Sequence, residues 1–379
     1  MKGEKLNIII SGGGTGGHIF PALSIASALQ EKYGDNVNIL FVGADGRMEM
    51  QRVPAAGYPI KGLPICGFDR KNLLKNFIVF YKIIKSQWLA RKIIKDFHPH
   101  VTVGVGGYAS GPLLKTAAMM GIPTLIQEQN SYAGVTNKLL SKKATKICVA
   151  YEGMERFFDK KKILLTGNPV RQGLINTTID KTEATRFFNL NPNKQTILII
   201  GGSLGARTIN ESILSHIDLI KKSNVQFIWQ TGKIYHDEIK QRLEPFGDLP
   251  MLHVTDFISN MEHAYAASDL VISRAGAGSI SEFCILKKPV ILVPSPNVAE
   301  DHQTKNAMAL VQKNAAILIR DNEAKDSLIK TAIESISNKK LLESLSMNIS
   351  SMAFYNAADI IADEVYKLAI SYKTKVKKQ

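Results

Sequence analysis

The stretch that decides the fold is Ile8-Ile9-Ile10-Ser11-Gly12-Gly13-Gly14-Thr15-Gly16-Gly17-His18-Ile19-Phe20-Pro21-Ala22. Its three branched apolar residues predict a buried strand, and its five glycines predict a tight turn. The residues that follow, 23–29, have helical spacing. A strand, a glycine turn and a helix aim backbone amides and the positive helix end at a phosphate. We therefore expect an α/β fold in which this turn faces a second such turn, with a diphosphate-linked sugar between them.

The chain has the size and composition of a folded protein with two domains. It has 379 residues, of which 45% are hydrophobic and 21% charged, and a net charge of +15. An excess of basic residues is compatible with nucleic acid, acidic membrane lipid or phosphorylated substrates as partners, and it does not distinguish among the three.

The cysteines and the hydropathy pattern predict a cytoplasmic protein. Cys66, Cys148 and Cys284 lie far apart without CxxC spacing, which predicts reduced thiols rather than disulfides or a metal site. We expect no secretion signal and no membrane span, since no apolar run approaches the ~20 residues that a span needs.

Strand-like and helical runs alternate along the chain, which predicts parallel sheets with crossover helices. After the first strand, strands are expected at residues 39–42, 101–103, 123–126, 146–149, 197–200, 226–229, 251–254, 270–272 and 290–293. The pattern breaks at residues 167–171 and restarts at Thr196, so we expect two sheets with a boundary between residues 168 and 180. The predicted domains are residues 1–168 and 169–351, with a Lys-rich helix at residues 352–379 that rejoins the first.

The first turn alone leaves alternatives open. Gly12, Gly14 and Gly17 match a dinucleotide fingerprint, and Asp45 ends the second strand, where a ribose-binding acid can lie. A nicotinamide-dependent dehydrogenase is therefore one alternative, and a glycine turn without a ligand is another.

Two further glycine turns separate a strand from a helix, at residues 201–207 and 273–282. One dinucleotide does not need two phosphate turns in separate domains, whereas a donor diphosphate and an acceptor do. Ser203 can bind a phosphate oxygen or cap the helix. Glu282 can bind a ribose, or be a carboxylate that the helix dipole favours.

Seven short motifs occur in a fixed order, at residues 11–18, 106–112, 128–130, 167–171, 201–207, 281–282 and 300–307. With them the chain resembles the MurG family over nearly its full length. Members of that family transfer N-acetylglucosamine from UDP to lipid I and form lipid II in peptidoglycan synthesis.

The resemblance implies a GT-B glycosyltransferase, with two Rossmann-like domains facing a central cleft. It implies inverting transfer to the C4 hydroxyl of the muramoyl sugar, with donor in the C-terminal domain and lipid acceptor in the N-terminal domain. Donor-binding positions are matched by Thr15, Gly16, Gly17, Asn130, Arg171, Ser203, Ile258 (through its backbone), Ala277, Gly278, Ser279, Glu282 and Gln303. Gly14 and Tyr108 are matched to the acceptor.

Charge develops on the departing UDP, and the amides of the second and third turns can stabilise it. The sequence has no DxD motif, so we expect no metal ion and no other cofactor. His18 is the expected base for the attacking hydroxyl, and Glu128 is a second candidate that can instead be a structural carboxylate. The chain has Gln127 where family members often have histidine; because glutamine is no base, this favours His18 or substrate-assisted deprotonation.

Residues 61–100 contain nine Lys or Arg and two acids. Within them Leu73, Phe77, Phe80, Ile84 and Trp88 follow helical spacing, and Lys82 and Lys85 lie largely to other sides. We expect this segment to dock on the anionic inner face of the cell membrane, although a helix that merely covers the sheet would show a similar stripe.

Two rival functions fit parts of the pattern. One is a UDP-sugar 2-epimerase, which would need no lipid, and the other is a UDP-sugar-binding protein without catalysis. The sequence has no RNP-like or zinc motif and no helix with clustered arginines, so we expect no nucleic-acid partner.

Overall fold

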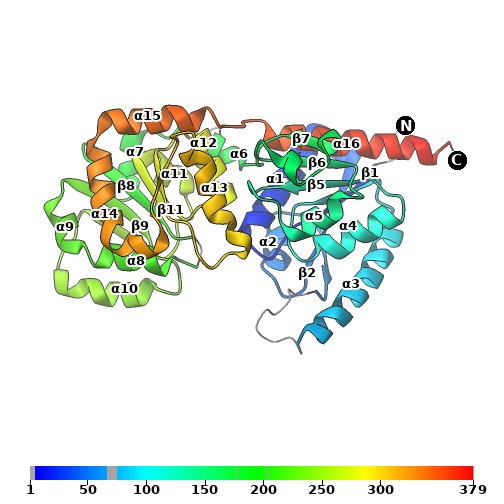
Figure 1. Ribbon diagram of the computed structural model, residues 1–379, viewed down its shortest axis with the longest axis horizontal. Coiled ribbons are helices and arrows are strands. Elements are labelled where there is room, and N and C mark those ends of the chain that lie inside the picture. Colours follow the sequence, from blue (N-terminus) through cyan, green and yellow to red (C-terminus); the bar gives the residue numbers. More distant parts are fainter. Residues whose placement is uncertain (1–4, 66–74, 176, 203, 379) are drawn as a thin grey trace. The chain divides into compact units, whose positions relative to one another are not determined.

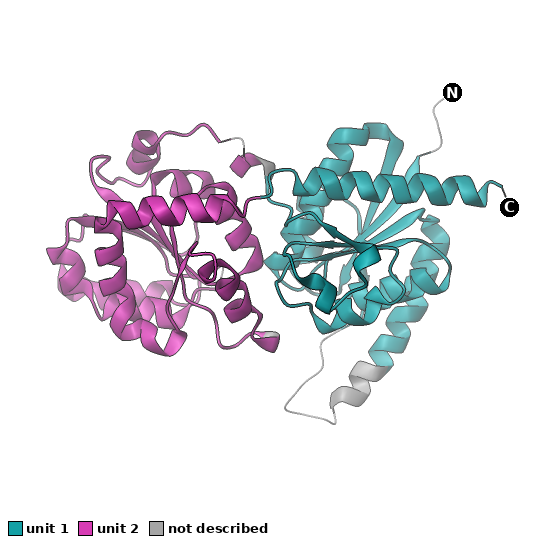
Figure 2. Ribbon diagram, turned by 45° about the horizontal axis from the view of Figure 1, so that its top comes forward, with its two compact units in different colours: residues 1–171, 354–379 teal, residues 172–353 magenta. Residues whose placement is uncertain are grey.

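The computed structural model describes residues 5–65, 75–175, 177–202 and 204–378 (Figure 1). The chain forms two compact units, one of residues 1–171 with 354–379 and the other of residues 172–353 (Figure 2). Each unit is built around a parallel sheet of its own, which confirms the predicted α/β class.

The first unit has a seven-stranded sheet in the order β3-β2-β1-β4-β5-β6-β7, and every neighbouring pair is parallel. The third strand in this order, β1, pairs Ile8 with Ile39 on one side and with Val101 on the other. The strands are β1 (Leu6–Ser11), β2 (Val37–Ala44), β3 (Ile60–Leu63), β4 (Val101–Gly104), β5 (Thr124–Glu128), β6 (Lys146–Val149) and β7 (Ile163–Leu165). The helices are α1 (Gly16–Tyr33), α2 (Glu49–Ala55), α3 (Lys75–Phe97), α4 (Ser110–Met119), α5 (Val135–Ser141) and α16 (Ala357–Val376).

The second unit has a six-stranded sheet in the order β10-β9-β8-β11-β12-β13, again parallel throughout. Its strands are β8 (Gln195–Ile200), β9 (Val225–Gln230), β10 (Leu252–Thr255), β11 (Leu270–Ser273), β12 (Val290–Leu292) and β13 (Ile317–Leu318). Its helices are α6 (Gln172–Ile175), α7 (Lys181–Phe187), α8 (Arg207–Leu214), α9 (Ile217–Lys222), α10 (His236–Leu243), α11 (Met261–Ala267), α12 (Ala277–Ile285), α13 (His302–Val311), α14 (Asp321–Ser337) and α15 (Lys339–Ser350).

The run of three isoleucines in β1 is explained by burial on both faces of the sheet. Ile8 and Ile10 pack in one core cluster with α1 and α16, and Ile9 packs in the other cluster with α3 and α4. All three side chains are fully buried. A strand covered by helices on both faces has no polar face, so its sequence shows no alternation.

The last helix, α16, belongs to the core of the first unit. Its residues Ile361 and Val365 are fully buried in the cluster that contains Ile8. The Tyr366 ring stacks on the Tyr33 ring of α1 at a centroid distance of 3.6 Å. The Tyr33 hydroxyl donates to Asp363 over 2.6 Å. Figure 1 shows α16 lying alongside the elements of the first unit although it is the end of the chain.

We expect the Ile361→Ala substitution to lower the free energy of unfolding by about 2–5 kcal/mol, because it removes buried volume from the core. Ile360 is the matched control on the same helix, because it is 39% exposed whereas Ile361 is 0% exposed. Ile360→Ala should cost under about 1 kcal/mol. Denaturant unfolding followed by circular dichroism measures both, and equal losses would show that α16 does not complete this core.

Candidate functional site

Each sheet has a switch point, where the strand order reverses, between β1 and β4 in the first unit and between β8 and β11 in the second. Ligands of open parallel sheets bind outside the carboxyl ends of the strands at such points. The turns found there are residues 12–15 and 105–109 in the first unit, and 201–206 and 274–276 in the second. These are the glycine turns that the sequence indicated.

The first turn is held by Glu49, a carboxylate that the sequence analysis did not single out. Glu49 begins α2 and is fully buried. It accepts a hydrogen bond from the Gly14 amide at 2.8 Å and another from the Ala44 amide at 3.0 Å. A Cβ on Gly13 would overlap this carboxylate. The turn therefore needs glycine at position 13 because a buried acid occupies the side-chain space.

His18 lies in the first turn of α1, with its ring against the glycine turns. Its Nδ1 is 3.1 Å from the Gly13 carbonyl oxygen and 3.4 Å from the Thr15 hydroxyl. A carbonyl only accepts, so Nδ1 carries the proton in this contact and the neutral ring has its lone pair on Nε2. A Cβ on Gly106 would come within 2.5 Å of the His18 ring. The site thus contains a histidine with a fixed ring orientation and a basic Nε2.

The helix start beside His18 can bind an anion. Thr15 is the N-cap of α1, and its side chain makes no cap hydrogen bond. Thr15 and Gly17 are exposed, and Gly16 is half-buried. Amides in the first turn of a helix attract negative groups. An anion at this helix start would therefore lie beside one continuous segment, which contains Gly14, Thr15, Gly16, Gly17 and His18.

The turn after β4 adds Tyr108 beside the first turn. The Ser110 hydroxyl donates to the carbonyl oxygens of Ser11 at 3.0 Å and Gly106 at 2.8 Å, which ties the ends of β1 and β4 together. Tyr108 is half exposed at the surface of this turn. It can therefore contact a ligand that reaches the edge of the first sheet.

Glu128, at the end of β5, is a buried carboxylate with four hydrogen bonds. It accepts from the backbone and side-chain nitrogens of Asn130 at 3.1 and 3.2 Å, from the Gly134 amide at 3.0 Å and from Asn137 at 2.8 Å. Both oxygens are directed at the loop that follows β5. This geometry supports the structural role for Glu128, which holds Asn130 and the start of α5 in place.

Gln127 lies in a buried amide network and is fully buried. It donates to Asn168 over 2.9 Å and accepts from the side chain of Gln129. Gln129 also donates to the Val105 carbonyl at 2.6 Å, and Asn168 donates to the Gln129 carbonyl at 3.0 Å. In this chain position 127 supports the loops from within the unit, which leaves His18 as the candidate base at the surface.

Arg171 is the last residue of the first segment of this unit. Its guanidinium lies 5.6 Å from the centroid of the Phe20 ring on α1. Phe20 is 44% exposed, so the pair lies at the surface near the start of α1.

In the second unit, Gln230 links two turns at the edge of the sheet. Its side-chain nitrogen donates to the Gly202 carbonyl at 2.8 Å, and its oxygen accepts from the Ile258 amide at 3.4 Å. Ile258 is buried, so only its backbone can contact a ligand, and its amide already has a partner. Ser203 lies outside the described residues.

The start of α12 is an uncapped helix N-terminus at the switch point. Gly276 is the N-cap, has no side chain to cap with, and is followed by Ala277, Gly278 and Ser279. The first turn has no acidic residue. Glu282, one turn further, accepts a hydrogen bond from the Tyr265 hydroxyl at 2.7 Å. This is the strongest candidate phosphate site of the second unit, because its helix start has no side-chain cap and no acid in the first turn to compete with a phosphate.

The two residues before α13, which contains Gln303, have strained backbone. Glu300 and Asp301 both have positive φ, at 55° and 50°, in the left-handed region that residues other than glycine rarely adopt. The Gln303 side-chain oxygen accepts from the Ser295 amide at 2.8 Å. This hydrogen bond orients the Gln303 side chain. Its amide nitrogen then points away from the Ser295 amide and can donate to a hydroxyl group.

Two of the three cysteines lie among the described residues. Cys148 and Cys284 are free and buried, and burial raises the pKa of each thiol to about 12, while Cys66 lies outside the described residues. Among the residues that the structure describes, no group of three or more His, Cys, Asp and Glu is placed to hold a metal ion.

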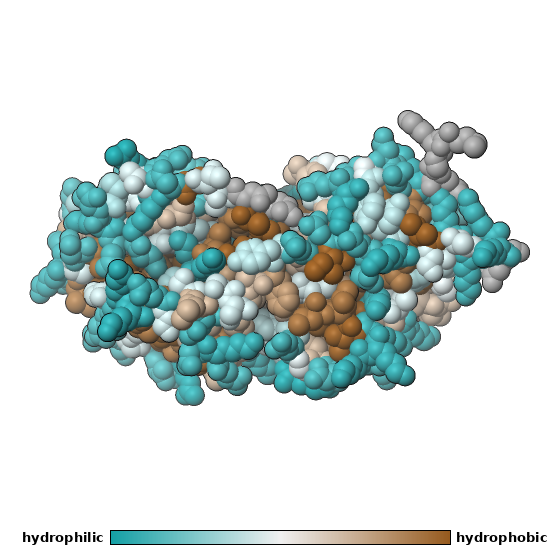
Figure 3. All heavy atoms as spheres, turned by 90° about the horizontal axis from the view of Figure 1, so that it is seen from above, coloured by the Kyte–Doolittle hydropathy of each residue, from teal (hydrophilic) through white to brown (hydrophobic). Residues whose placement is uncertain are grey.

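Helix α3 exposes an apolar stripe. Tyr81, Ile84 and Trp88 are 65%, 59% and 66% exposed. Lys85 beside them is exposed and Lys82 is half-buried. Phe77 and Phe80 belong to a stretch whose side chains lie outside the described part. Hydrophobic patches between hydrophilic side chains are also visible on the face drawn in Figure 3. None of the described helices has the length and hydropathy of a membrane span.

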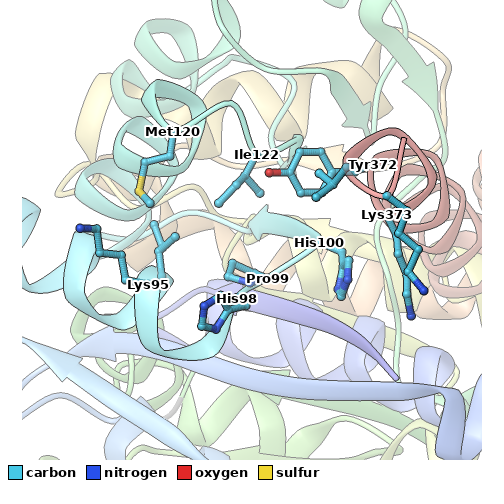
Figure 4. A pocket seen from close by; sticks show the side chains of 11 residues that line it. Lys95, His98, Pro99, His100, Met120, Ile122, Tyr372 and Lys373 are labelled. Carbon is cyan, nitrogen blue, oxygen red and sulfur yellow. The ribbon is translucent and has the colours of Figure 1, made fainter. Parts of the chain in front are cut away.

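A pocket of about 630 Å³ lies at the other edge of the first sheet, where the ends of α3 and α16 meet (Figure 4). Its basic lining residues are Lys95, His98, His100, Lys373 and Lys377. His100 and Ile122 precede the first residues of β4 and β5, so the pocket lies at the amino ends of the strands. It is therefore separate from the glycine turns at their carboxyl ends.

Two family models match most of the chain. The model described as glycosyltransferase family 28 N-terminal domain matches residues 8–149. The model described as glycosyltransferase family 28 C-terminal domain matches residues 196–361. These matches exclude the nicotinamide-dependent dehydrogenase. Asp45 is therefore not assigned the role of binding a cofactor's ribose.

Curated relatives align over nearly the full length of both chains. A UDP-N-acetylglucosamine--N-acetylmuramyl-(pentapeptide) pyrophosphoryl-undecaprenol N-acetylglucosamine transferase of Phocaeicola vulgatus is 70% identical and aligns over 98% of both chains. A transferase of the same name from Bacteroides fragilis is 63% identical over 97% of both.

Solved structures show the same fold. The crystal structure of Acinetobacter baumannii MurG has a TM-score of 0.76 and 26% identity, and covers 96% of this chain and 100% of that one. A UDP-GlcNAc 2-epimerase from Neisseria meningitidis bound to UDP-GlcNAc has a TM-score of 0.67, with coverage of 96% and 100%. At 16% identity that likeness concerns the fold alone. The chain belongs to glycosyltransferase family 28 and, within it, to the MurG family.

Proposed function

We propose that this chain transfers N-acetylglucosamine from UDP-N-acetylglucosamine to lipid I, forming lipid II in peptidoglycan synthesis. The observation that carries this is the 70% identity to a transferase of that name, over 98% of both chains. The site geometry supports it, because each unit has a glycine turn before a helix start at its switch point, where an anion can bind.

In this proposal the second unit binds the donor. The amides at Ala277, Gly278 and Ser279 bind the diphosphate, and they stabilise the charge that develops on UDP as the sugar leaves. Glu282 accepts from the ribose, the Ile258 backbone contacts the uracil, and the Gln303 side-chain nitrogen donates to sugar hydroxyls. Arg171 and Ser203 complete the donor set. We propose that the reaction needs no metal ion, because these amides and the helix dipole supply the positive potential.

In the first unit, Gly14 and Tyr108 bind the acceptor, and Thr15, Gly16, Gly17 and Asn130 contact the sugar end of the donor. His18 Nε2 takes the proton from the C4 hydroxyl of the muramoyl sugar as that oxygen attacks the anomeric carbon. Attack on the face opposite UDP inverts the configuration. Glu128 acts as a positioning residue, since both of its oxygens are bonded to the loop that carries Asn130.

We also propose that the first unit docks on the cytoplasmic face of the cell membrane through the stripe on α3. Exposed aromatic and apolar side chains with lysines around them suit an anionic lipid surface. The lipid-linked acceptor requires access to that surface.

One experiment distinguishes transfer from its rivals. The protein is incubated with labelled UDP-N-acetylglucosamine, with and without a lipid I analogue. Label that moves to lipid only when the analogue is present supports the transferase. Conversion of the label to the C2 epimer without acceptor would indicate an epimerase, and no reaction would indicate a binding protein.

Substitution of His18 by alanine should reduce kcat by about 10²- to 10⁴-fold, because the attacking hydroxyl loses its base. The KM for UDP-N-acetylglucosamine should change little, since the donor is bound mainly by the second unit. His98→Asn is the control, because His98 is an exposed histidine of the same unit with positive φ that asparagine tolerates. Near-normal turnover of the His18→Ala enzyme would exclude His18 as the base.

The double substitution Ile84→Ser with Trp88→Ser should lower the bound fraction several-fold in co-sedimentation with phosphatidylglycerol vesicles, because it removes apolar surface that enters the bilayer. Transfer to a water-soluble acceptor analogue should stay unchanged. Met347→Ser is the control, since Met347 is an equally exposed apolar residue of the second unit. Unchanged vesicle binding in the double variant would contradict docking through α3.

A further inference from the structure

One peptide bond of the first turn is held between two side chains. The Gly14 amide donates to Glu49 Oε2 at 2.8 Å, and the Gly13 carbonyl oxygen is 3.1 Å from His18 Nδ1. This amide and this carbonyl belong to the same peptide group, which is trans because the described chain has no cis bond. A trans peptide is planar, and its N–H and C=O point in opposite directions. Because Glu49 accepts the hydrogen bond from this N–H, it also sets the direction of the Gly13 carbonyl that His18 contacts.

The Glu49 carboxylate is itself held in place by the sheet, so it can fix the position of that peptide group. Its other oxygen accepts from the Ala44 amide at 3.0 Å, at the end of β2. Glu49 is fully buried. Gly13 and Gly43 leave the space it occupies, since a Cβ on Gly43 would lie 2.5 Å from Glu49 Cγ and one on Gly13 would overlap its carboxyl group. The two hydrogen bonds to one carboxylate therefore connect this peptide to the end of β2.

The His18 ring has little room to turn away from this peptide. A Cβ on Gly106 would be 2.5 Å from His18 Cδ2 and 2.7 Å from Nε2, so the ring packs on the backbone there. Gly107 approaches the Gly13 carbonyl on its other side, where a Cβ would overlap the oxygen. The packing of the two turns and the hydrogen bond to the Glu49 carboxylate thus both fix the position of the Gly13 carbonyl.

We propose that Glu49 is a positioning residue that orients His18 through the Gly13–Gly14 peptide. It keeps the Gly13 carbonyl directed at Nδ1, so that Nδ1 carries the proton and Nε2 is the basic nitrogen. In a Ser–His–Asp triad the acid contacts the histidine directly, whereas here a peptide group lies between them and is polarised from both ends. The proposal rests on the function proposed above, because it makes Glu49 a partner of the catalytic base.

The test begins with Glu49→Gln, which keeps the shape but has only one acceptor oxygen for two amide donors. We expect kcat of transfer to fall about 10- to 100-fold, with KM for UDP-N-acetylglucosamine within about twofold. We expect Glu49→Gln to cause little further loss in a His18→Ala background, because both substitutions act through one group. An unchanged kcat, or losses that multiply in the double variant, would overturn the proposal.

Val53→Ala is the control for a merely structural role. Val53 is fully buried on the same helix, α2, in the core cluster that contains Ile8. Thermal unfolding shows whether the two variants are destabilised to a similar degree. The proposal expects Val53→Ala to keep its kcat, and Glu49→Asp, which keeps two acceptor oxygens, to recover part of the loss seen with glutamine.

A second readout does not need activity. Nitrogen-15 chemical shifts of the His18 ring report which nitrogen carries the proton in the neutral form. We expect the Nδ1–H tautomer in the wild-type protein and a mixture of tautomers in Glu49→Gln. If the wild-type protein lacks transfer, the proposed function fails while this measurement still decides the positioning role. The same tautomer in both proteins would overturn it.

Discussion

The candidate site depends on the close approach of backbone to backbone where the parallel strands end. A Cβ on Gly107 would overlap the Gly13 carbonyl, and a Cβ on Gly205 would overlap the Thr231 carbonyl. Turns from neighbouring strands can therefore touch only because these positions are glycine. The contact brings turns of each unit together at the edge of its sheet. Each of these turns leads into the start of a helix, where backbone amides can bind an anion.

The central strands of both sheets could be predicted because their residues are apolar and bounded by glycine turns. The sequence analysis did not find β3, β7 and β13, which are short strands toward the sheet edges. Their residues are only half-buried for the most part, so packing imposes no strong pattern on them. Strand pairing determines them, and pairing between segments far apart in the chain leaves little local signal.

The turns of the site could also be predicted, but the groups that support them could not. Glu49 is remote from Gly14 in sequence and lies in a segment with many polar residues. The glycines that leave space for its side chain, Gly13 and Gly43, are next to it in the fold but do not indicate a carboxylate in the sequence. Likewise, Glu128 and Gln127 read as polar residues after a strand, and only the folded structure shows which loops they hold. Arg274 is a further example, since it donates to the Val293 carbonyl and pairs with Asp321.

We propose that backbone amides at the start of α12, and not a metal ion, neutralise the diphosphate of the donor. The most direct measurement is a titration of nitrogen-15-labelled protein with UDP in the presence of a chelator, with uridine as the comparison. We expect the amide resonances of Ala277, Gly278 and Ser279 to shift with UDP and not with uridine. Resonances that stay in place, or that shift only after magnesium or manganese is added, would contradict it.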